Sequence, residues 1–147
     1  MDATRQLDAF IDRYSPEVAA DGRTALNFLE RRMPTATRLV YDNYNALVVG
    51  FGPDDKASHA IFSIAFYPKY VRLFFLRGVD LADPEGLLEG EGVQVRSIKL
   101  DPASLITAVE VGALIDAAIA LARPLAAVGK GELIIRSISA RQRTRRP

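Results

Sequence analysis

Three arginines stand in the middle of segments that are typical of β-strands, and together they could bind an anion. Arg72, Arg96 and Arg136 each interrupt an otherwise apolar alternation. A guanidinium carries a planar fork of N–H donors that matches a carboxylate or a phosphate. If neighbouring strands carry the three side chains on one face, they converge on one ligand. The pattern therefore predicts a site for a small anionic ligand, while solvated arginines on an open sheet face are the alternative.

A polar turn between two apolar strands is the second candidate region. Loops held by a rigid scaffold often carry function, although Asp and Asn also suit turn geometry and tyrosines also pack. An enzyme built on Tyr41, Asp42 and Arg72 is a further alternative. The residues that we predict to bind a ligand are Tyr41, Asp42, Asn43, Tyr44, Tyr70, Arg72, Arg96 and Arg136.

The residue types exclude several chemistries. The chain has no cysteine and one histidine, which excludes thiol catalysis, zinc fingers, iron–sulfur clusters and disulfides. His59 follows Ser58, but no Gly-x-Ser-x-Gly motif is present, so we interpret it as a loop histidine. Asp8 and Asp12 share one helical face and could offer oxygens to a hard cation, but no tight Asp-x-Asp loop is present, and we prefer a solvated helix face as the interpretation. We predict no catalytic residue, no metal site and no cofactor.

The charge is unevenly distributed along the 147 residues. Four of the 19 basic residues fall within 141–147, which leaves 15 basic against 18 acidic residues over 1–140. A body with this balance is not expected to bind nucleic acid. Residues 141–147 contain no core-forming side chain, so we expect a disordered, arginine-rich tail whose deletion leaves the melting temperature unchanged.

Hydropathy bears on the location and partners of the chain. No run of about 18 apolar residues and no secretory leader is present, which predicts a cytoplasmic protein without a membrane partner. The predicted partners are a small anionic ligand or another protein, and a homodimer is left open.

The elements that must position these residues follow from hydrophobic periodicity and turn signals. Two helices are expected at the N-terminus and one near the C-terminus, with six strands between and after them. The expected helices are 3–14, 16–33 and 108–122, and the expected strands are 37–42, 46–52, 60–67, 70–77, 93–100 and 132–138. Tight turns between consecutive strands favour a largely antiparallel sheet of five to six strands with the helices packed on it. The fold class is therefore α+β, in one domain over 1–140.

The predicted core consists of apolar residues at regular positions of the best-defined elements. They are Leu39, Val48, Phe62, Ile64, Phe66, Leu73, Phe75 and Ile119.

The succession of elements is similar to a known family. Two helices precede a strand and polar turn (LVYDNYNALVVGF), a hairpin follows with Pro-Lys-Tyr-Val-Arg-Leu-Phe, and GEGVQVRSIKL leads through Asp-Pro to a closing helix. Over roughly residues 5–122 this order resembles the YdhG-like family, a domain of unknown function (number eighteen-oh-one). The resemblance implies a compact α/β domain. Because some members resemble frataxin-like iron chaperones in proposed role, it also implies iron binding by the carboxylates of the first helix as an alternative function.

Overall fold

The computed structural model describes residues 1–147 and contains three α-helices and six β-strands. The helices are α1 (Ala3–Asp12), α2 (Pro16–Arg32) and α3 (Val109–Leu121). The strands are β1 (Thr37–Asp42), β2 (Leu47–Gly52), β3 (Phe62–Phe66), β4 (Val71–Phe75), β5 (Arg96–Lys99) and β6 (Leu133–Ile138). Three short 3-10 helices, Ala57–His59, Gly78–Asp80 and Ala103–Thr107, lie in the connections. Each predicted helix and strand is therefore confirmed, with ends that differ by a few residues.

The six strands form one sheet in the order β5-β4-β3-β2-β1-β6. Strands β1 to β5 are antiparallel neighbours, and short turns join β1 to β2 and β3 to β4. The chain then crosses the sheet through α3, and β6 pairs with β1 in parallel. The predicted α+β class is confirmed, and the sheet is mixed rather than purely antiparallel.

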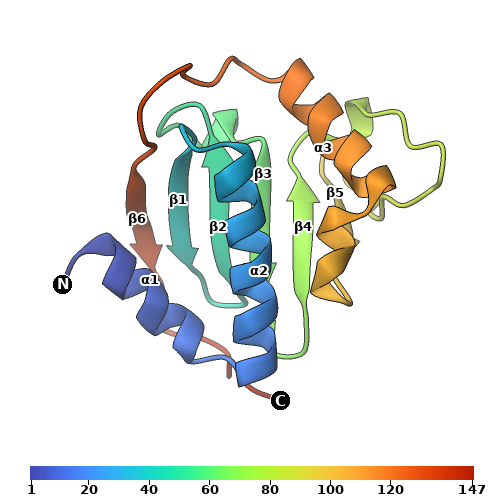
Figure 1. Cartoon of the computed structure of the whole chain (residues 1–147). Helices are drawn as coiled ribbons and strands as arrows, with labels where there is room; N and C mark the ends of the chain where they lie inside the picture. The colour runs from blue at the N-terminus through green and yellow to red at the C-terminus, as the bar shows by residue number, and fades with distance from the viewer.

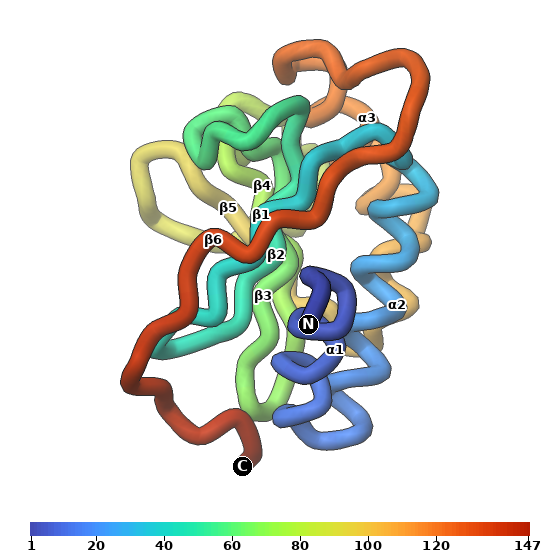
Figure 2. The backbone as a smooth tube through the Cα atoms, turned by 90° about the vertical axis from the view of Figure 1, so that its left-hand side faces the viewer, coloured from blue at the N-terminus to red at the C-terminus, as the bar shows by residue number.

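All three helices pack on one face of the sheet (Figures 1 and 2). The core lies between the two layers and is rich in buried phenylalanines from β2, β3 and β4. On α2, Gly22 lies against Phe66, and a Cβ at this position would stand 1.9 Å from the Phe66 ring. A glycine is needed here because the ring packs directly on the helix backbone. Six of the eight predicted core residues are buried, whereas Val48 and Ile119 are half-buried.

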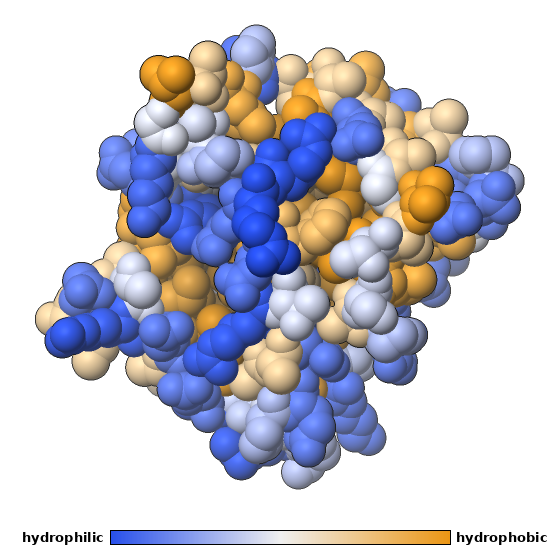
Figure 3. Space-filling view, viewed as in Figure 1, coloured by the Kyte–Doolittle hydropathy of each residue, from blue (hydrophilic) through white to orange (hydrophobic).

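The outer surface of the helical layer is strongly patterned. Figure 3 shows a hydrophilic ridge over α2, with apolar surface on both sides of it. Helix α2 begins with a Ser15 cap and Pro16 and carries Arg31 and Arg32 in its last turn, so both ends are stabilised by charge and hydrogen bonding. None of the helices is both long and apolar enough to cross a membrane.

The register determines which side chains face the helices. Tyr41, Val48, Ala65, Arg72 and Lys99 are cross-strand neighbours and form one row. The adjacent row contains Phe66, which contacts α2, so the row of Tyr41 and Arg72 points to the side that carries no helix.

The prediction that Arg72, Arg96 and Arg136 converge is wrong. Arg96 pairs with Phe75, in a row that faces the helices, whereas Arg72 points to the other side. Arg136 is exposed at a β-bulge on β6, which is separated from β4 by three strands. The crossover through α3 places β6 at the opposite edge from β5, and no local sequence signal indicated that position.

The expectation of a disordered tail is also wrong. Residues 139–147, which we call the arginine segment, carry no helix or strand, yet Arg145 is only 4% exposed. The segment runs from the end of β6 to the junction of α1 and α2, close to the N-terminal end of α2 (Figure 1). Polar groups at this junction and at the β1–β2 turn hold it in place.

Candidate functional site

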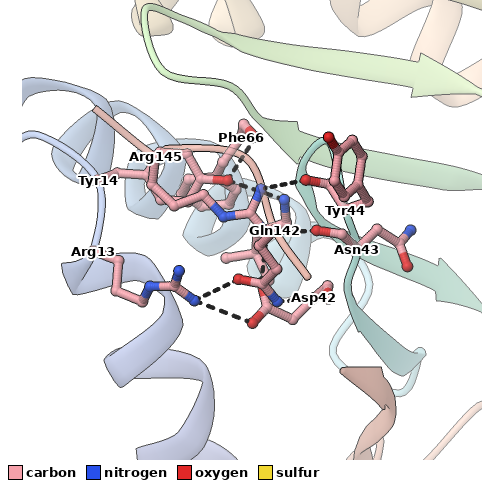
Figure 4. Close-up of polar contacts among 9 residues, drawn as sticks. Arg13, Tyr14, Asp42, Asn43, Tyr44, Phe66, Gln142 and Arg145 are labelled. Atoms are coloured by element: carbon pink, nitrogen blue, oxygen red, sulfur yellow. Dashed lines mark hydrogen bonds and ion pairs between the residues drawn. The ribbon is translucent and has the colours of Figure 1, made fainter. Parts of the chain in front are cut away.

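Tyr14, between α1 and α2, lies at the centre of a polar cluster (Figure 4). Its side chain is 1% exposed, its hydroxyl donates to the Phe66 carbonyl at 2.9 Å, and the same oxygen accepts from the Leu47 N–H at 3.0 Å. Leu47 and Phe66 are cross-strand partners, so the hydroxyl bridges the ends of β2 and β3. Burial raises the pKa of Tyr14, which keeps the hydroxyl protonated and able to donate.

Asp42 ends β1 on the face that the helices cover, and it is paired with Arg145. The Arg145 Nη2 donates to Asp42 Oδ1 at 2.9 Å and to the Asn43 carbonyl at 2.6 Å. Its Nη1 lies 3.4 Å from the Tyr44 carbonyl, and its guanidinium carbon is 5.7 Å from the centre of the Tyr14 ring. We call these four groups the Asp42 cage: the Asp42 carboxylate, the Asn43 and Tyr44 carbonyls, and the Tyr14 ring.

The cage leaves two buried polar atoms without a hydrogen bond. These atoms are Asp42 Oδ2 and Arg145 Nε. The Arg13 Nη1 stands 3.6 Å from Oδ2 and donates instead to the Gln142 Oε1 at 2.6 Å. Arg145 therefore contacts the carboxylate through one oxygen, whereas a guanidinium can engage both oxygens of a carboxylate.

Two further arginines of the arginine segment, Arg143 and Arg146, contact groups outside the Asp42 cage. The Arg146 guanidinium donates to the carbonyls of Arg13 at 3.2 Å and Asp12 at 3.4 Å, at the C-terminal end of α1. These carbonyls lack helical partners and lie at the negative end of the helix dipole. Arg143 lies 5.6 Å from the Tyr44 ring centre and donates its backbone N–H to the Tyr44 carbonyl at 2.9 Å. Three of the four arginines thus make specific contacts.

A cavity of about 430 Å³ lies at the opposite end of the sheet, where β3 begins and β4 ends, beside the C-terminal end of α3. Its apolar walls are Ala60, Ile61, Phe75, Leu81, Ala118, Leu121 and Ala122. Its polar residues are Ser58, His59, Arg77, Asp80 and Arg123.

The charges around the cavity favour an anion. Arg77 and Arg123 contribute two permanent positive charges, and Asp80, the one carboxylate of the lining, lies 3.0 Å from the Arg77 Nε. Arg123 makes no ion pair. The lining is therefore positive, although residues 1–140 carry a negative balance.

His59 is oriented by a carboxylate at the edge of this cavity. Its Nδ1 lies 2.8 Å from Asp54 Oδ2, and Asp54 also accepts from the Lys56 N–H at 2.9 Å. The hydrogen bond with His59 is the main reason that the pKa of Asp54 is lowered. Because Nδ1 is engaged, Nε2 is the ring nitrogen left for a ligand.

The structure divides the predicted ligand-binding residues into separate groups. Asp42, Asn43 and Tyr44 do lie together, but they surround Arg145 rather than the strand arginines. Tyr41 and Arg72 share the helix-free face, on β1 and β4, with two strands between them. Arg72 contacts Ser97 and Glu89, and the Tyr70 ring on the same side lies beside Lys99.

Two alternatives from the sequence do not assemble. An enzyme on Tyr41, Asp42 and Arg72 fails because Asp42 points toward the helices, away from the other two side chains. For iron, Asp12 and Asp8 both lie near Arg23, with N–O distances of 2.9 and 3.9 Å. No group of three or more potential metal-ligating side chains is present.

Sequence reasoning missed the residues that complete both sites. Arg145 sits in a polar run without periodicity, and the only signal for it was the excess of arginines in that run. His59 was noticed, but Arg77 and Arg123 come from a loop and a helix end, and only the packing of α3 on the sheet brings them to one cavity.

Comparison with family models, with curated proteins and with solved structures gives no match for this chain. The resemblance to the YdhG-like family stays a prediction, and both sites are characterised by their geometry.

Proposed function

We propose that this chain is a binding module for a small organic anion with an apolar body, and that the ligand occupies the cavity beside α3. The observation that carries the proposal is the composition of the cavity lining. Apolar walls from β4, α3 and the connections beside them line a volume of about 430 Å³, and the polar lining contains Arg77, Arg123 and His59 with one carboxylate, Asp80. A ligand with a hydrocarbon portion and one carboxylate or phosphate complements this lining.

Both parts of such a ligand contribute to binding. The volume falls within the range of about 300–1,000 Å³ that is usual for small-molecule sites. Transfer of the hydrocarbon portion onto Phe75, Leu81 and Leu121 is favourable by about 25 cal/mol for each Å² of apolar surface buried. The two guanidinium groups add charge-assisted hydrogen bonds and therefore select an anion over a neutral molecule of the same shape.

The charge on the ligand is tested by isothermal titration calorimetry with phenylacetate and its neutral analogue 2-phenylethanol. We expect the wild-type chain to bind phenylacetate more tightly than 2-phenylethanol. In the double variant Arg77→Gln, Arg123→Gln, the affinity for phenylacetate is expected to fall about tenfold, which corresponds to about 1.4 kcal/mol. The affinity for 2-phenylethanol is expected to stay unchanged, because the apolar walls are intact.

Arg5→Gln is the matched control, since Arg5 is exposed on α1, outside the cavity, and its side chain makes no ion pair. This variant is expected to bind phenylacetate as the wild type does. Equal phenylacetate affinity in the double variant and in Arg5→Gln would contradict the proposal.

A further inference from the structure

Hydrogen bonds, an ion pair and two cation–π contacts attach the arginine segment to the rest of the molecule. The segment has no helix or strand, and Arg145 is its one buried residue. Its backbone bonds come from Ser139 to the Asp42 carbonyl and from Arg143 to the Tyr44 carbonyl, both at 2.9 Å. Because little apolar surface holds the segment, local opening at this place is much easier than global unfolding.

The surface beneath the segment presents acceptors and a ring that suit a guanidinium group. A carboxylate, two backbone carbonyls and a tyrosine ring surround Arg145 and accept its planar array of donors (Figure 4). Lysine presents a compact ammonium that cannot reach these acceptors and stack on the ring at once. The Tyr44 ring and the carbonyls of Asp12 and Arg13 form two neighbouring subsites for Arg143 and Arg146.

The fit of the chain's own segment is incomplete. Asp42 Oδ2 and Arg145 Nε are both buried and both lack a hydrogen bond. A guanidinium shifted by a small distance would engage both carboxylate oxygens and satisfy these atoms. The site therefore offers one carboxylate oxygen, Asp42 Oδ2, to which the bound Arg145 makes no hydrogen bond.

Opening of the segment leaves a site that requires a cation. Asp42 is 1% exposed, and once Arg145 leaves, the nearest positive group is Arg13 at 3.6 Å from Oδ2. Opening therefore takes from the Asp42 carboxylate its shortest ion pair, and a guanidinium that enters the site restores that charge-assisted hydrogen bond.

We propose that the Asp42 cage, with the Tyr44 ring and the C-terminal carbonyls of α1, is a docking site for an arginine-rich, extended peptide segment of another polypeptide. The arginine segment of the chain itself occupies this site and exchanges with the partner. The partner must present arginines with the spacing of Arg143, Arg145 and Arg146. This interaction is independent of the anion cavity, which lies at the other end of the sheet.

The chain's own arginine segment competes with any added peptide for the site, so the experiment must weaken that segment first. A tethered segment has an effective concentration in the millimolar range, so a free peptide binds the wild-type chain weakly. The substitution Arg145→Ala removes the anchoring guanidinium and leaves the cage empty. Arg141→Ala is the matched control because the Arg141 side chain is exposed and makes no hydrogen bond or ion pair.

The experiment measures fluorescence anisotropy with a labelled synthetic peptide of sequence SARQRTRRP, corresponding to residues 139–147. We expect the full-length Arg145→Ala chain to bind this peptide at least about tenfold more tightly than the Arg141→Ala chain does. A peptide with lysine in place of the arginine at position 145 is expected to bind about tenfold more weakly, although its net charge is the same. Equal affinity for the two peptides, or equal affinity of the two chains, would overturn the proposal.

A second measurement uses the wild-type chain and does not depend on the folding of a variant. Excess unlabelled peptide is added while the amide resonances of the chain are followed by NMR. We expect shifts at residues 139–146, because the chain's own segment is displaced, whereas Asn43 and Tyr44 change little because the peptide has the same sequence and restores the same contacts. Resonances that stay unchanged at saturating peptide would refute exchange at this site.

Discussion

At the residue scale, one hydroxyl and one ion pair join segments that lie far apart in the sequence. The Tyr14 hydroxyl bridges the Leu47 N–H and the Phe66 carbonyl, while Asp42 pairs with Arg145, 103 positions later. Neither contact is visible as a motif. Each depends on a register that places the side chain on the helix-covered face of the sheet.

The substitution Tyr14→Phe isolates the contribution of the bridging hydroxyl. The ring packing on Phe66 is retained, but the buried Leu47 N–H and Phe66 carbonyl lose their partner. We expect the free energy of unfolding in urea to fall by about 1–3 kcal/mol. Tyr44→Phe is the control, since the Tyr44 hydroxyl makes no hydrogen bond and the side chain is exposed, so its free energy of unfolding stays within about 0.5 kcal/mol of wild type. Equal stability of the two variants would contradict the bridging role.

The substitution Asp21→Asn tests a carboxylate that disfavours folding when it is ionised. Burial, and then the nearby carboxylates of Asp101 and Glu17, raise the pKa of Asp21. A raised carboxyl pKa means that stability is present below the unfolded pKa of about 3.9 and is lost as the pH rises through the folded pKa. Asp21→Asn is therefore expected to raise the melting temperature at pH 7, but not at about pH 3.

Asp55→Asn serves as the control for this comparison, because Asp55 is exposed and makes no ion pair. Its melting temperature is expected to follow that of the wild type at both pH values. A gain in Asp21→Asn that is equally large in acid would show that charge is not its cause.

At the element scale, substitution by alanine is expected to have opposite effects on stability at two helical glycines, because only one of them packs closely on the sheet. A Cβ at Gly22 would stand 1.9 Å from the Phe66 ring, whereas a Cβ at Gly112 on α3 has no atom within 4 Å. Gly22→Ala is expected to lower the free energy of unfolding by about 1–3 kcal/mol through overpacking. Gly112→Ala is expected to raise it by about 0.5–1 kcal/mol through helix propensity. A stabilising Gly22→Ala would show that α2 does not lie directly on Phe66.

The same scale explains which parts of the fold could be predicted. Periodicity over 3–14 and 37–42 reports local conformation, so each element of the sheet and each helix was expected. The position of β6 beside β1 depends on a crossover through α3, which no local pattern encodes. Arg136 was therefore predicted to lie beside Arg72, although its strand, β6, is an edge strand that is separated from β4 by three strands.

The candidate sites were predictable to a smaller extent. The turn at Asp42–Tyr44 was recognised because its composition is unusual between two apolar strands. Its partner Arg145 was not recognised, since an arginine in a polar run gives no sign of burial until the position of the buried carboxylate is known. The anion cavity was missed because its polar residues His59, Arg77 and Arg123 come from three separate connections.

At the scale of the whole molecule, the arginine segment closes the end of the sheet and contributes to stability. Deletion of residues 141–147 removes Arg145, the closest ion-pair partner of Asp42. We expect this deletion to lower the free energy of unfolding by about 3 kcal/mol, as for a broken buried ion pair, with a clear fall in melting temperature. Deletion of 147 alone retains all three arginine contacts and is the control. Equal melting temperatures for the two shortened chains would show that the segment does not dock.

The two ends of the sheet thus have different chemistry. The Asp42 cage at one end is acidic, and the cavity at the other end has apolar walls and two arginines in its lining. The central claim is that the cavity binds small organic anions, and NMR shift mapping with phenylacetate tests it most directly. The account predicts that phenylacetate shifts the amide resonances of residues 58–61, 77–81 and 118–123, while 2-phenylethanol at the same concentration causes much smaller shifts. Shifts confined to the helix-free face around Tyr41, Tyr70 and Arg72, or no shifts at millimolar phenylacetate, would contradict it.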